Sequence, residues 1–167
     1  MIEDCLDDID IIPLSELRCN KKTFNSHSLA LNHYFHKQAS QDEKKNLSKC
    51  FVLINEERII GYYTLSATSV GIHDIPKENI KKEIRYPNIP AVLLGRLAID
   101  KNFLKQGYGK FLVADAIYKA KNTNLGVALL IVDAKDDEAI TFYKKLGFIQ
   151  FMDKEDKLFF PLTKLIK

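Results

Sequence analysis

The chain has 167 residues, 46% of them hydrophobic and 28% charged, with a formal net charge of +3 at pH 7. No apolar run approaches the roughly 20 residues of a membrane span, and the acidic start, Met1–Asp8, lacks the pattern of a signal peptide. We therefore expect one cytoplasmic domain over residues 1–167, with no membrane insertion. Cys5, Cys19 and Cys50 show no metal-ligand spacing, so we expect reduced thiols and no metal site.

The first half of the chain predicts a strand, a helix and a hairpin, in that order. Ile11, Ile12 and Leu14 around Pro13 indicate a short first strand. A helix follows, with Asn25-Ser26 as its N-cap and an apolar face that starts at Leu29, before a polar stretch over residues 38–48.

Two runs rich in β-formers, 50–54 and 59–66, flank a polar turn and predict an antiparallel hairpin. Residues 76–84 indicate a short helix, and 86–90 an extended approach to the next strand.

The second half alternates strands with helices. Residues 91–99 and 129–133 indicate strands, and residues 109–121 and 139–146 carry apolar positions at helical spacing. Two closing antiparallel strands are expected at 148–151 and 158–162. The pattern predicts an α+β fold with a mixed central sheet of about six or seven strands and helices packed on it.

A glycine turn, Gln106-Gly-Tyr-Gly-Lys110, lies between the strand at 91–99 and the helix that follows. A strand that leads through glycines into a helix N-terminus directs several unpaired N–H groups and the positive end of the helix dipole at one point, which suits a pyrophosphate. Two glycines alone are a weak signal. The Rossmann pattern fails because its third glycine is replaced by Leu112, and no Walker A loop is present.

From about Cys50 to Leu162 the chain resembles the GNAT N-acetyltransferases. Their acyl-CoA loop has a basic residue or glutamine, two free positions, glycine, one free position, then glycine or alanine; here Leu104 to Gly109 match except at Leu104. A second family pattern matches Ala139, Tyr143, Gly147 and Phe148, with Asp136 in place of asparagine. The resemblance implies a GNAT fold with helices on both faces of the sheet, acetyl-CoA as cosubstrate and N-acetyltransferase activity.

The resemblance also implies a role for particular residues. The backbone of the strand before the loop would pair with the pantetheine arm, and one of its N–H groups would polarise the thioester carbonyl. The loop would hold the pyrophosphate, and either Lys105 or Gln106 would replace the side chain missing at Leu104. The residues expected to bind the cofactor are Leu97, Ala98, Ile99, Lys105, Gln106, Gly107, Tyr108, Gly109, Lys110, Ala139 and Phe142.

Tyr143 and Arg96 each allow two interpretations. By helical spacing Tyr143 is a core tyrosine; by the family pattern it donates a proton to the departing CoA thiolate. Arg96 lies on the strand face opposite Leu97 and is either a surface or salt-bridged arginine or a substrate-binding cation at the edge of the site.

The strand at 91–99 carries no carboxylate to act as a base. An α-amine, with a pKa near 7.7–8.0, needs a base less than a lysine amine with a pKa of about 10.4. An acceptor of low pKa is therefore favoured, with Asp133 a distant alternative base.

A narrower resemblance, over residues 24–35, 61–69, 90–100 and 132–136, is to GNAT toxins of bacterial toxin–antitoxin modules. It implies acetylation of the α-amine of aminoacyl-tRNA, inhibition of translation, a ribbon-helix-helix antitoxin, DNA contact only through that antitoxin, and a homodimer. The alternatives are a housekeeping GNAT enzyme for a small amine or a protein N-terminus, and a non-catalytic CoA-binding regulator.

Overall fold

The computed structural model describes residues 8–167; the acidic start and Cys5 lie outside the described residues. Seven strands form a mixed sheet in the order β1-β2-β3-β4-β5-β7-β6. The chain divides into two compact units. The first holds residues up to Leu65 and Arg96–Val113, and the second holds Ser66–Gly95 and Ala114–Lys167.

The strands of the first unit confirm the predicted first strand and hairpin. β1 (Ile9–Pro13) pairs antiparallel with β2 (Lys49–Asn55), which pairs antiparallel with the start of β3 (Arg58–Gly71). Glu56, in the turn between β2 and β3, has a φ of 54°. The last residues of β4 (Asn88–Ile99) also belong to this unit.

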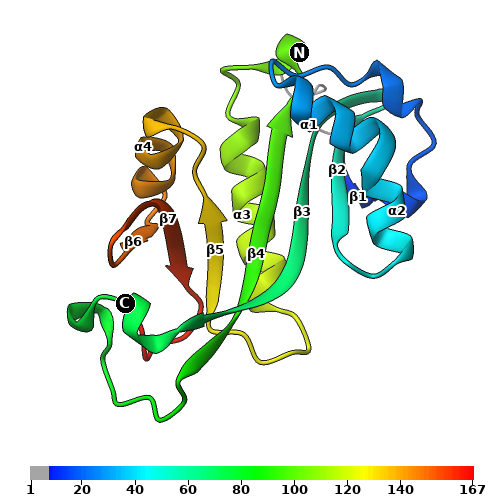
Figure 1. Cartoon of the computed structure of the whole chain (residues 1–167). Coiled ribbons are helices and arrows are strands. Elements are labelled where there is room, and N and C mark those ends of the chain that lie inside the picture. The colour runs from blue at the N-terminus through cyan, green and yellow to red at the C-terminus, as the bar shows by residue number, and fades with distance from the viewer. Residues whose placement is uncertain (1–7) are drawn as a thin grey trace. The chain divides into compact units, whose positions relative to one another are not determined.

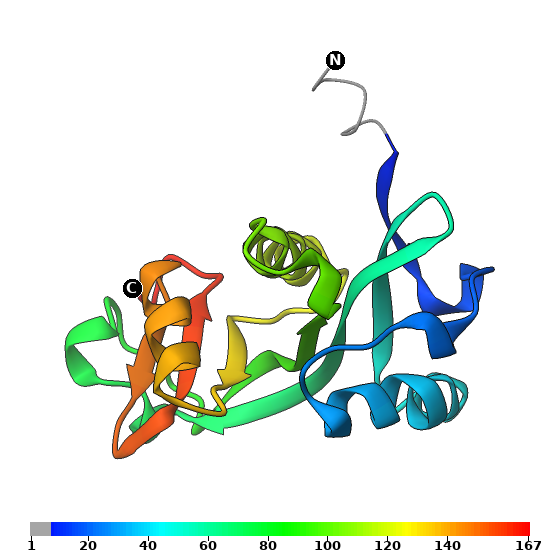
Figure 2. The ribbon, with the colours of Figure 1, turned by 90° about the horizontal axis from the view of Figure 1, so that it is seen from above.

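The predicted first helix is present, but it is longer than expected and begins later. It consists of α1 (Leu29–His33), a π-helical turn (Tyr34–Gln38) and α2 (Ala39–Lys44), so it continues into the stretch expected to be only polar. Its N-cap is Ser28, whose Oγ accepts the Leu31 N–H at 3.3 Å, and not Asn25-Ser26. Figure 2 shows this helical segment, in blue and cyan, on one face of the first unit's strands.

The core beneath that helical segment is largely aromatic. Phe35 stacks on Tyr62 with ring centroids 4.6 Å apart, and Phe24 meets both rings edge-on. The Tyr62 hydroxyl donates to the Leu31 carbonyl at 2.7 Å, which joins β3 to α1. Gly61 faces the other side of the strand, where its nearest neighbours include a Leu112 methyl of α3 (Tyr108–Lys121). Helices therefore cover both faces of this part of the sheet, as predicted.

The second unit contains the remaining predicted strands and helices (Figure 1). The first part of β4 pairs parallel with β5 (Leu129–Asp133), which pairs antiparallel with β7 (Lys154–Pro161), and β7 with β6 (Ile149–Phe151). The helix α4 (Asp137–Lys145) packs on β7. One buried cluster of this unit is formed by Ile75, Ile89, Ala91, Leu129, Ile131, Phe151, Phe159 and Ile166.

The short helix predicted over residues 76–84 is wrong. Only Lys77–Asn79 form a 3₁₀ turn. Ile80 then forms a β-bridge with Ile166, and the Lys81 N–H donates to the Leu165 carbonyl at 2.7 Å, so pairing with the distant C-terminal segment replaces the local helix. Within residues 8–167, no helix combines the length and the apolar character needed to cross a membrane.

Candidate functional site: a strand end and a phosphate-binding loop

The strand β4 extends beyond its partner β5. Their parallel register runs from Ala91↔Leu129 to Leu94↔Val132, and within the described residues it includes no later pair. β4 continues to Ile99, and the three residues predicted to pair with a pantetheine arm, Leu97, Ala98 and Ile99, lie in this extension. The backbone there is not used for pairing with β5, so that edge can bind a ligand.

The neighbouring strand β3 holds this end of β4 at close range. A Cβ atom at Gly61 would lie 2.7 Å from the Ala98 carbonyl oxygen and 2.7 Å from Ile99 Cδ1, distances that only a glycine allows. The Asp100 N–H donates to the Ile60 carbonyl at 2.8 Å. The position of Ala98 is therefore set by the absence of a side chain at Gly61.

Asp100, which the sequence analysis did not single out, anchors the turn after β4. It is 4% exposed; its Oδ2 accepts the Asn25 N–H at 2.9 Å and its Oδ1 accepts the Asn102 N–H at 2.9 Å. The second bond caps a 3₁₀ turn, Lys101–Phe103, that leads into the glycine loop. An aspartate directly after a strand and before a turn is the signal that could have identified it.

The loop itself has the geometry predicted for a pyrophosphate site. Lys105 and Gly107 adopt left-handed φ values of 59° and 82°. The Phe111 N–H donates to the Gly107 carbonyl at 3.0 Å, so the N–H groups of Tyr108, Gly109 and Lys110 precede the first intrahelical bond of α3 and have no acceptor within the helix. A Cβ at Gly107 would meet no atom within 4 Å, so the space beside the loop is open. These donors at the positive end of a 14-residue helix fit a pyrophosphate.

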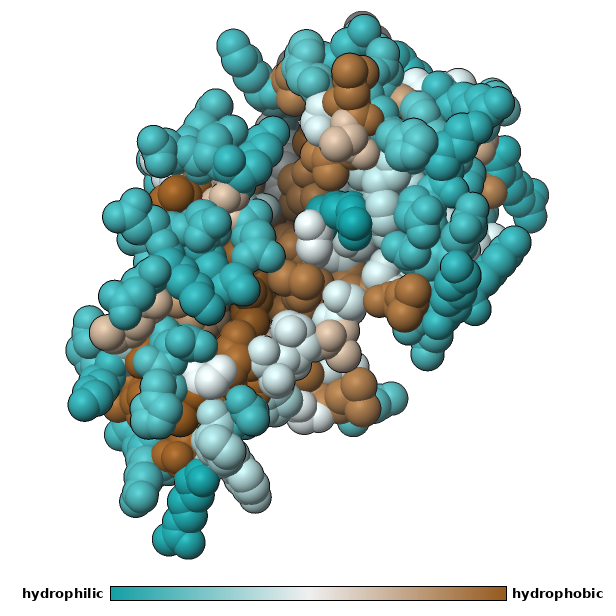
Figure 3. All heavy atoms as spheres, in the orientation of Figure 1, coloured by the Kyte–Doolittle hydropathy of each residue, from teal (hydrophilic) through white to brown (hydrophobic). Residues whose placement is uncertain are grey.

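Leu104, the departure from the family's loop pattern, is 41% exposed. Other large apolar side chains are exposed as well, among them Phe111 and Tyr118. The face shown in Figure 3 likewise has hydrophobic atoms among the hydrophilic ones. Leu104 offers no polar group to a phosphate, whereas the exposed Lys105 and Gln106 beside it do. They are the candidates for the missing side-chain contact.

The remaining predicted cofactor residues lie on α4 in the second unit, so the predicted residues are divided between the two units. Ala139 and Phe142 are half-buried there. The departure at Asp136 has a structural explanation: Asp136 is the N-cap of α4, and its Oδ1 accepts the Ala139 N–H at 2.8 Å. Asparagine and aspartate cap helices about equally well.

Tyr143 is 8% exposed and lies between two aromatic rings, with centroid distances of 5.1 Å to Phe142 and 5.2 Å to Phe148. Burial raises the pKa of Tyr143 to about 12, so the phenol is protonated at neutral pH. Within residues 8–167 its hydroxyl has no hydrogen-bond partner, and no side-chain polar atom there is both buried and unpaired. The oxygen therefore reaches the surface as a free donor, which a general acid requires.

The two charged residues weighed in the sequence have different surroundings. The Cζ of Arg96 lies 3.6 Å from the centroid of the Tyr34 ring, in the first unit. Asp133 ends β5 in the second unit and is paired with Lys157 at 3.8 Å, with its side chain more than half exposed. An exposed, paired carboxylate is a weak candidate for a base.

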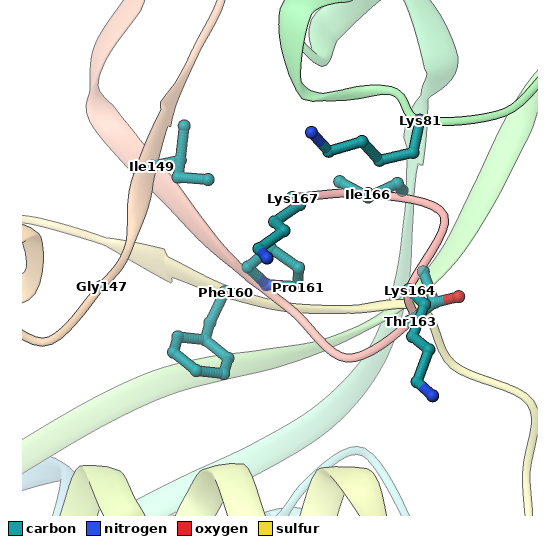
Figure 4. Close-up of a pocket in the computed structure, with 9 residues that line it drawn as sticks. All are labelled: Lys81, Gly147, Ile149, Phe160, Pro161, Thr163, Lys164, Ile166 and Lys167. Atoms are coloured by element: carbon teal, nitrogen blue, oxygen red, sulfur yellow. The ribbon is translucent and has the colours of Figure 1, made fainter.

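The second unit also contains an open cavity of about 650 Å³ (Figure 4). Phe160, Pro161, Ile149 and Ile166 form its apolar part, and three lysines line it as well: Lys81, Lys164 and Lys167. None of the residues predicted for acetyl-CoA or the acceptor lines this cavity. The predicted acetyl-CoA site, at the end of β4 and the glycine loop, is therefore separate from this cavity.

The fold and the loop together fit the class of proteins in which a glycine loop at a helix N-terminus, next to a free strand edge, accepts a pyrophosphate-bearing cofactor. Residues 46–150 match the family described as an acetyltransferase (GNAT) domain, which is more than half of the chain. The chain belongs to the GNAT acetyltransferase family.

Within this family, the chain is similar to several toxins and toxin structures. A tRNA-acetylating toxin of Mycobacterium tuberculosis is 32% identical over 128 residues, which cover 75% of this chain and 76% of the relative. The structure of AtaT complexed with acetyl-methionyl-tRNAfMet matches with a TM-score of 0.85 and 33% identity, over 92% of this chain and 95% of AtaT. A tyrosine-to-phenylalanine variant of AtaT, bound to acetyl-CoA and to the C-terminus of the antitoxin AtaR, matches with a TM-score of 0.78 and 32% identity, over 93% and 94%.

Proposed function

We propose that this GNAT enzyme is a toxin that transfers the acetyl group of acetyl-CoA to the α-amine of aminoacyl-tRNA and so blocks translation. The observation that carries the proposal is the β4 extension past Leu94, followed by the glycine loop at the start of α3, in a chain whose relatives acetylate tRNA. An acetylated α-amine cannot act as the nucleophile in peptide-bond formation, so the product is useless for elongation.

The chain's own residues have distinct proposed roles. Acetyl-CoA supplies the acetyl group as a thioester. The N–H groups of Gln106 to Lys110 bind the pyrophosphate, and the backbone of Leu97, Ala98 and Ile99 orients the pantetheine arm. An N–H of that strand segment polarises the thioester carbonyl and stabilises the oxyanion that forms when the amine attacks. Ala139 and Phe142 complete the cofactor contacts on α4.

Tyr143 is proposed as the general acid. Its protonated phenol donates a proton to the CoA sulfur as the carbon–sulfur bond breaks, so the thiol leaves instead of the thiolate. The raised pKa keeps that proton in place before the reaction. The attacking amine loses its proton to solvent, because the β4 residues from Ala91 to Ile99 include no carboxylate.

The proposed acceptor follows from that missing base. An α-amine has a pKa near 7.7–8.0, so a useful fraction is neutral at cellular pH, whereas a lysine amine with a pKa of about 10.4 is almost fully protonated. The aminoacyl end of a charged tRNA presents such an amine. The net charge of +3 suits a polyanionic carrier without strong non-specific attraction.

We also propose that residues 1–167 act as one catalytic domain in the cytoplasm, as a homodimer, and that a ribbon-helix-helix antitoxin neutralises it. DNA contact would then run through the antitoxin. The AtaT structure with a segment of AtaR supports a protein partner for this chain. Co-expression with the product of a neighbouring small reading frame, followed by size-exclusion chromatography with light scattering, tests the partner and the oligomer together.

The experiment that tests the function offers labelled acetyl-CoA and purified protein to three acceptors: a mixture of charged tRNAs, a panel of small amines, and peptides with free N-termini. We expect label in the charged tRNA fraction only. Label in the small amines or peptides alone indicates a housekeeping acetyltransferase. Binding of acetyl-CoA without transfer to any acceptor indicates a regulator.

A further inference from the structure

The guanidinium of Arg96 lies over the face of an aromatic ring. Its Cζ is 3.6 Å from the centroid of Tyr34, well within the distance at which a cation is attracted to a ring face. Arg96 is half-buried, and within residues 8–167 no carboxylate forms an ion pair with it. The positive charge is therefore held in place without a direct ion pair, although the guanidinium is one of the groups that lower the pKa of the nearby Asp42.

Hydrogen bonds of its hydroxyl fix the position of Tyr34. Its hydroxyl donates to Asp42 Oδ2 at 2.9 Å and lies 3.3 Å from the Ser48 hydroxyl, and Asp42 Oδ1 accepts the Gln38 amide at 2.9 Å. The ring is 6% exposed and stacks on Tyr62. A phenol that donates to a carboxylate gains electron density in its ring, which strengthens the attraction for the guanidinium.

This arrangement leaves the edge of the guanidinium available. Contact with a ring face does not use the N–H donors of a guanidinium, and within residues 8–167 no hydrogen bond engages those of Arg96. Arg96 lies two residues after Leu94, the last β4 residue in the register with β5, and directly before the predicted acyl-binding residues Leu97 to Ile99. A planar fork of N–H donors suits the paired oxygens of a phosphate.

We propose that Tyr34, supported by Asp42, is a positioning residue that orients Arg96 to bind a phosphate of the RNA acceptor. This inference rests on the proposed function, because the phosphate belongs to the aminoacyl-tRNA. Arg96 contacts the substrate, whereas Tyr34 and Asp42 act through Arg96. The role predicts that recognition of the phosphate weakens when the ring is removed, and that transfer to an acceptor without phosphate is affected much less.

The test is a double-mutant cycle on charged tRNA with Arg96→Gln, Tyr34→Leu and the double variant. The milder Asp42→Asn is added, which removes the charge and replaces one of the two acceptor oxygens by an amide nitrogen. Arg18→Gln, an exposed arginine of the same unit, is the charge-matched control. Readouts are KM and kcat for charged tRNA, the dependence of log KM on log salt concentration, and the rate with an amino acid methyl ester, which has the α-amine but no phosphate.

We expect Arg96→Gln to raise KM for charged tRNA by roughly 10- to 100-fold, as for a charged hydrogen bond, and to lower the salt slope by about 0.7–0.9. Tyr34→Leu raises KM less, and has almost no effect in the Arg96→Gln background, because it acts through Arg96. Asp42→Asn raises KM slightly with kcat unchanged. The Arg18→Gln variant stays at the wild-type level on both acceptors, and the other variants lose much less of the rate on the methyl ester than on charged tRNA.

The inference is wrong if the effects of Tyr34→Leu and Arg96→Gln on KM are additive, or if Arg96→Gln leaves the salt slope unchanged. Neither result contradicts the proposed function as long as the wild-type protein acetylates charged tRNA. If the wild-type protein acetylates the methyl ester but no charged tRNA, the proposed function is wrong. The proposed binding of an RNA phosphate by Arg96 is then wrong as well.

Discussion

Among single residues, the proposed mechanism depends most on Tyr143, whose hydroxyl supplies the proton. Tyr143→Phe removes only that hydroxyl, which has no hydrogen-bond partner within residues 8–167, so we expect the free energy of unfolding and the affinity for acetyl-CoA to stay near wild type. The turnover number should fall by roughly 10²- to 10⁴-fold, the range of general acid catalysis. Steady-state kinetics, calorimetric acetyl-CoA binding and urea unfolding measure the three quantities.

Tyr118→Phe is the matched control, because Tyr118 is 67% exposed on α3. Wild-type turnover in Tyr143→Phe would remove the general-acid role. A loss of acetyl-CoA binding in that variant would assign Tyr143 to binding and not to chemistry.

The raised pKa of Tyr143 makes a prediction about pH. The acid form of the phenol gives up the proton, so activity is lost only as the pH rises through the pKa, and burial raises that pKa to about 12. The rate should therefore rise through the α-amine pKa near 8 and then stay level to about pH 10, the ordinary tyrosine value. A rate profile on a stable amine acceptor measures this. A descending limb below about pH 9 that disappears in Tyr143→Phe would contradict the raised pKa, while still identifying Tyr143 as the acid.

At the scale of elements, the turn between β4 and α3 carries the clearest prediction. Gly107 has a φ of 82° and open space where a Cβ would lie, so Gly107→Ala meets no protein atom but strains the backbone by about 1–2 kcal/mol. It also fills space proposed for the pyrophosphate. We expect KM for acetyl-CoA to rise at least about tenfold, the equivalent of about 1.4 kcal/mol, with kcat less affected.

Gly126→Ala is the control, because a Cβ at Gly126 would likewise meet no atom within 4 Å and the residue has no left-handed φ. Equal KM values for acetyl-CoA in the two variants would indicate that the space beside Gly107 does not hold the cofactor.

The sequence predicted elements whose signals are local, and missed those set by distant contacts. The hairpin, α3, α4 and the closing strands follow from apolar periodicity and turn residues. The N-cap was placed too early because the Ser26 hydroxyl donates to Asn32 Oδ1 at 2.7 Å, while the Ser28 hydroxyl accepts the N–H of Leu31 and caps α1. The helix over 76–84 fails for the same kind of reason, since Ile80 pairs with Ile166.

The site shows the same division. The glycine turn and the α4 pattern identified the loop and Tyr143, because short motifs determine backbone geometry there. Strand alternation predicted on which face of β4 the side chain of Arg96 lies, but it did not predict the contact with Tyr34. Tyr34 lies 62 positions earlier, in a π-helical turn that no simple sequence pattern encodes. The capping role of Asp136 likewise became clear only in the structure.

For the whole molecule, the proposed cofactor and acceptor residues are shared by two compact units, and β3, β4 and α3 each contribute to both. Transfer to an aminoacyl-tRNA is the central property of the proposed function. Mass spectrometry of aminoacyl-adenosines, released by nuclease from total charged tRNA after incubation with acetyl-CoA, tests it most directly. We predict an acetyl group on the α-amine of at least one aminoacyl-adenosine with the wild-type chain, and strong depletion of that product with Tyr143→Phe. Unmodified aminoacyl-adenosines, from protein that acetylates another amine in the same reaction mixture, would contradict it.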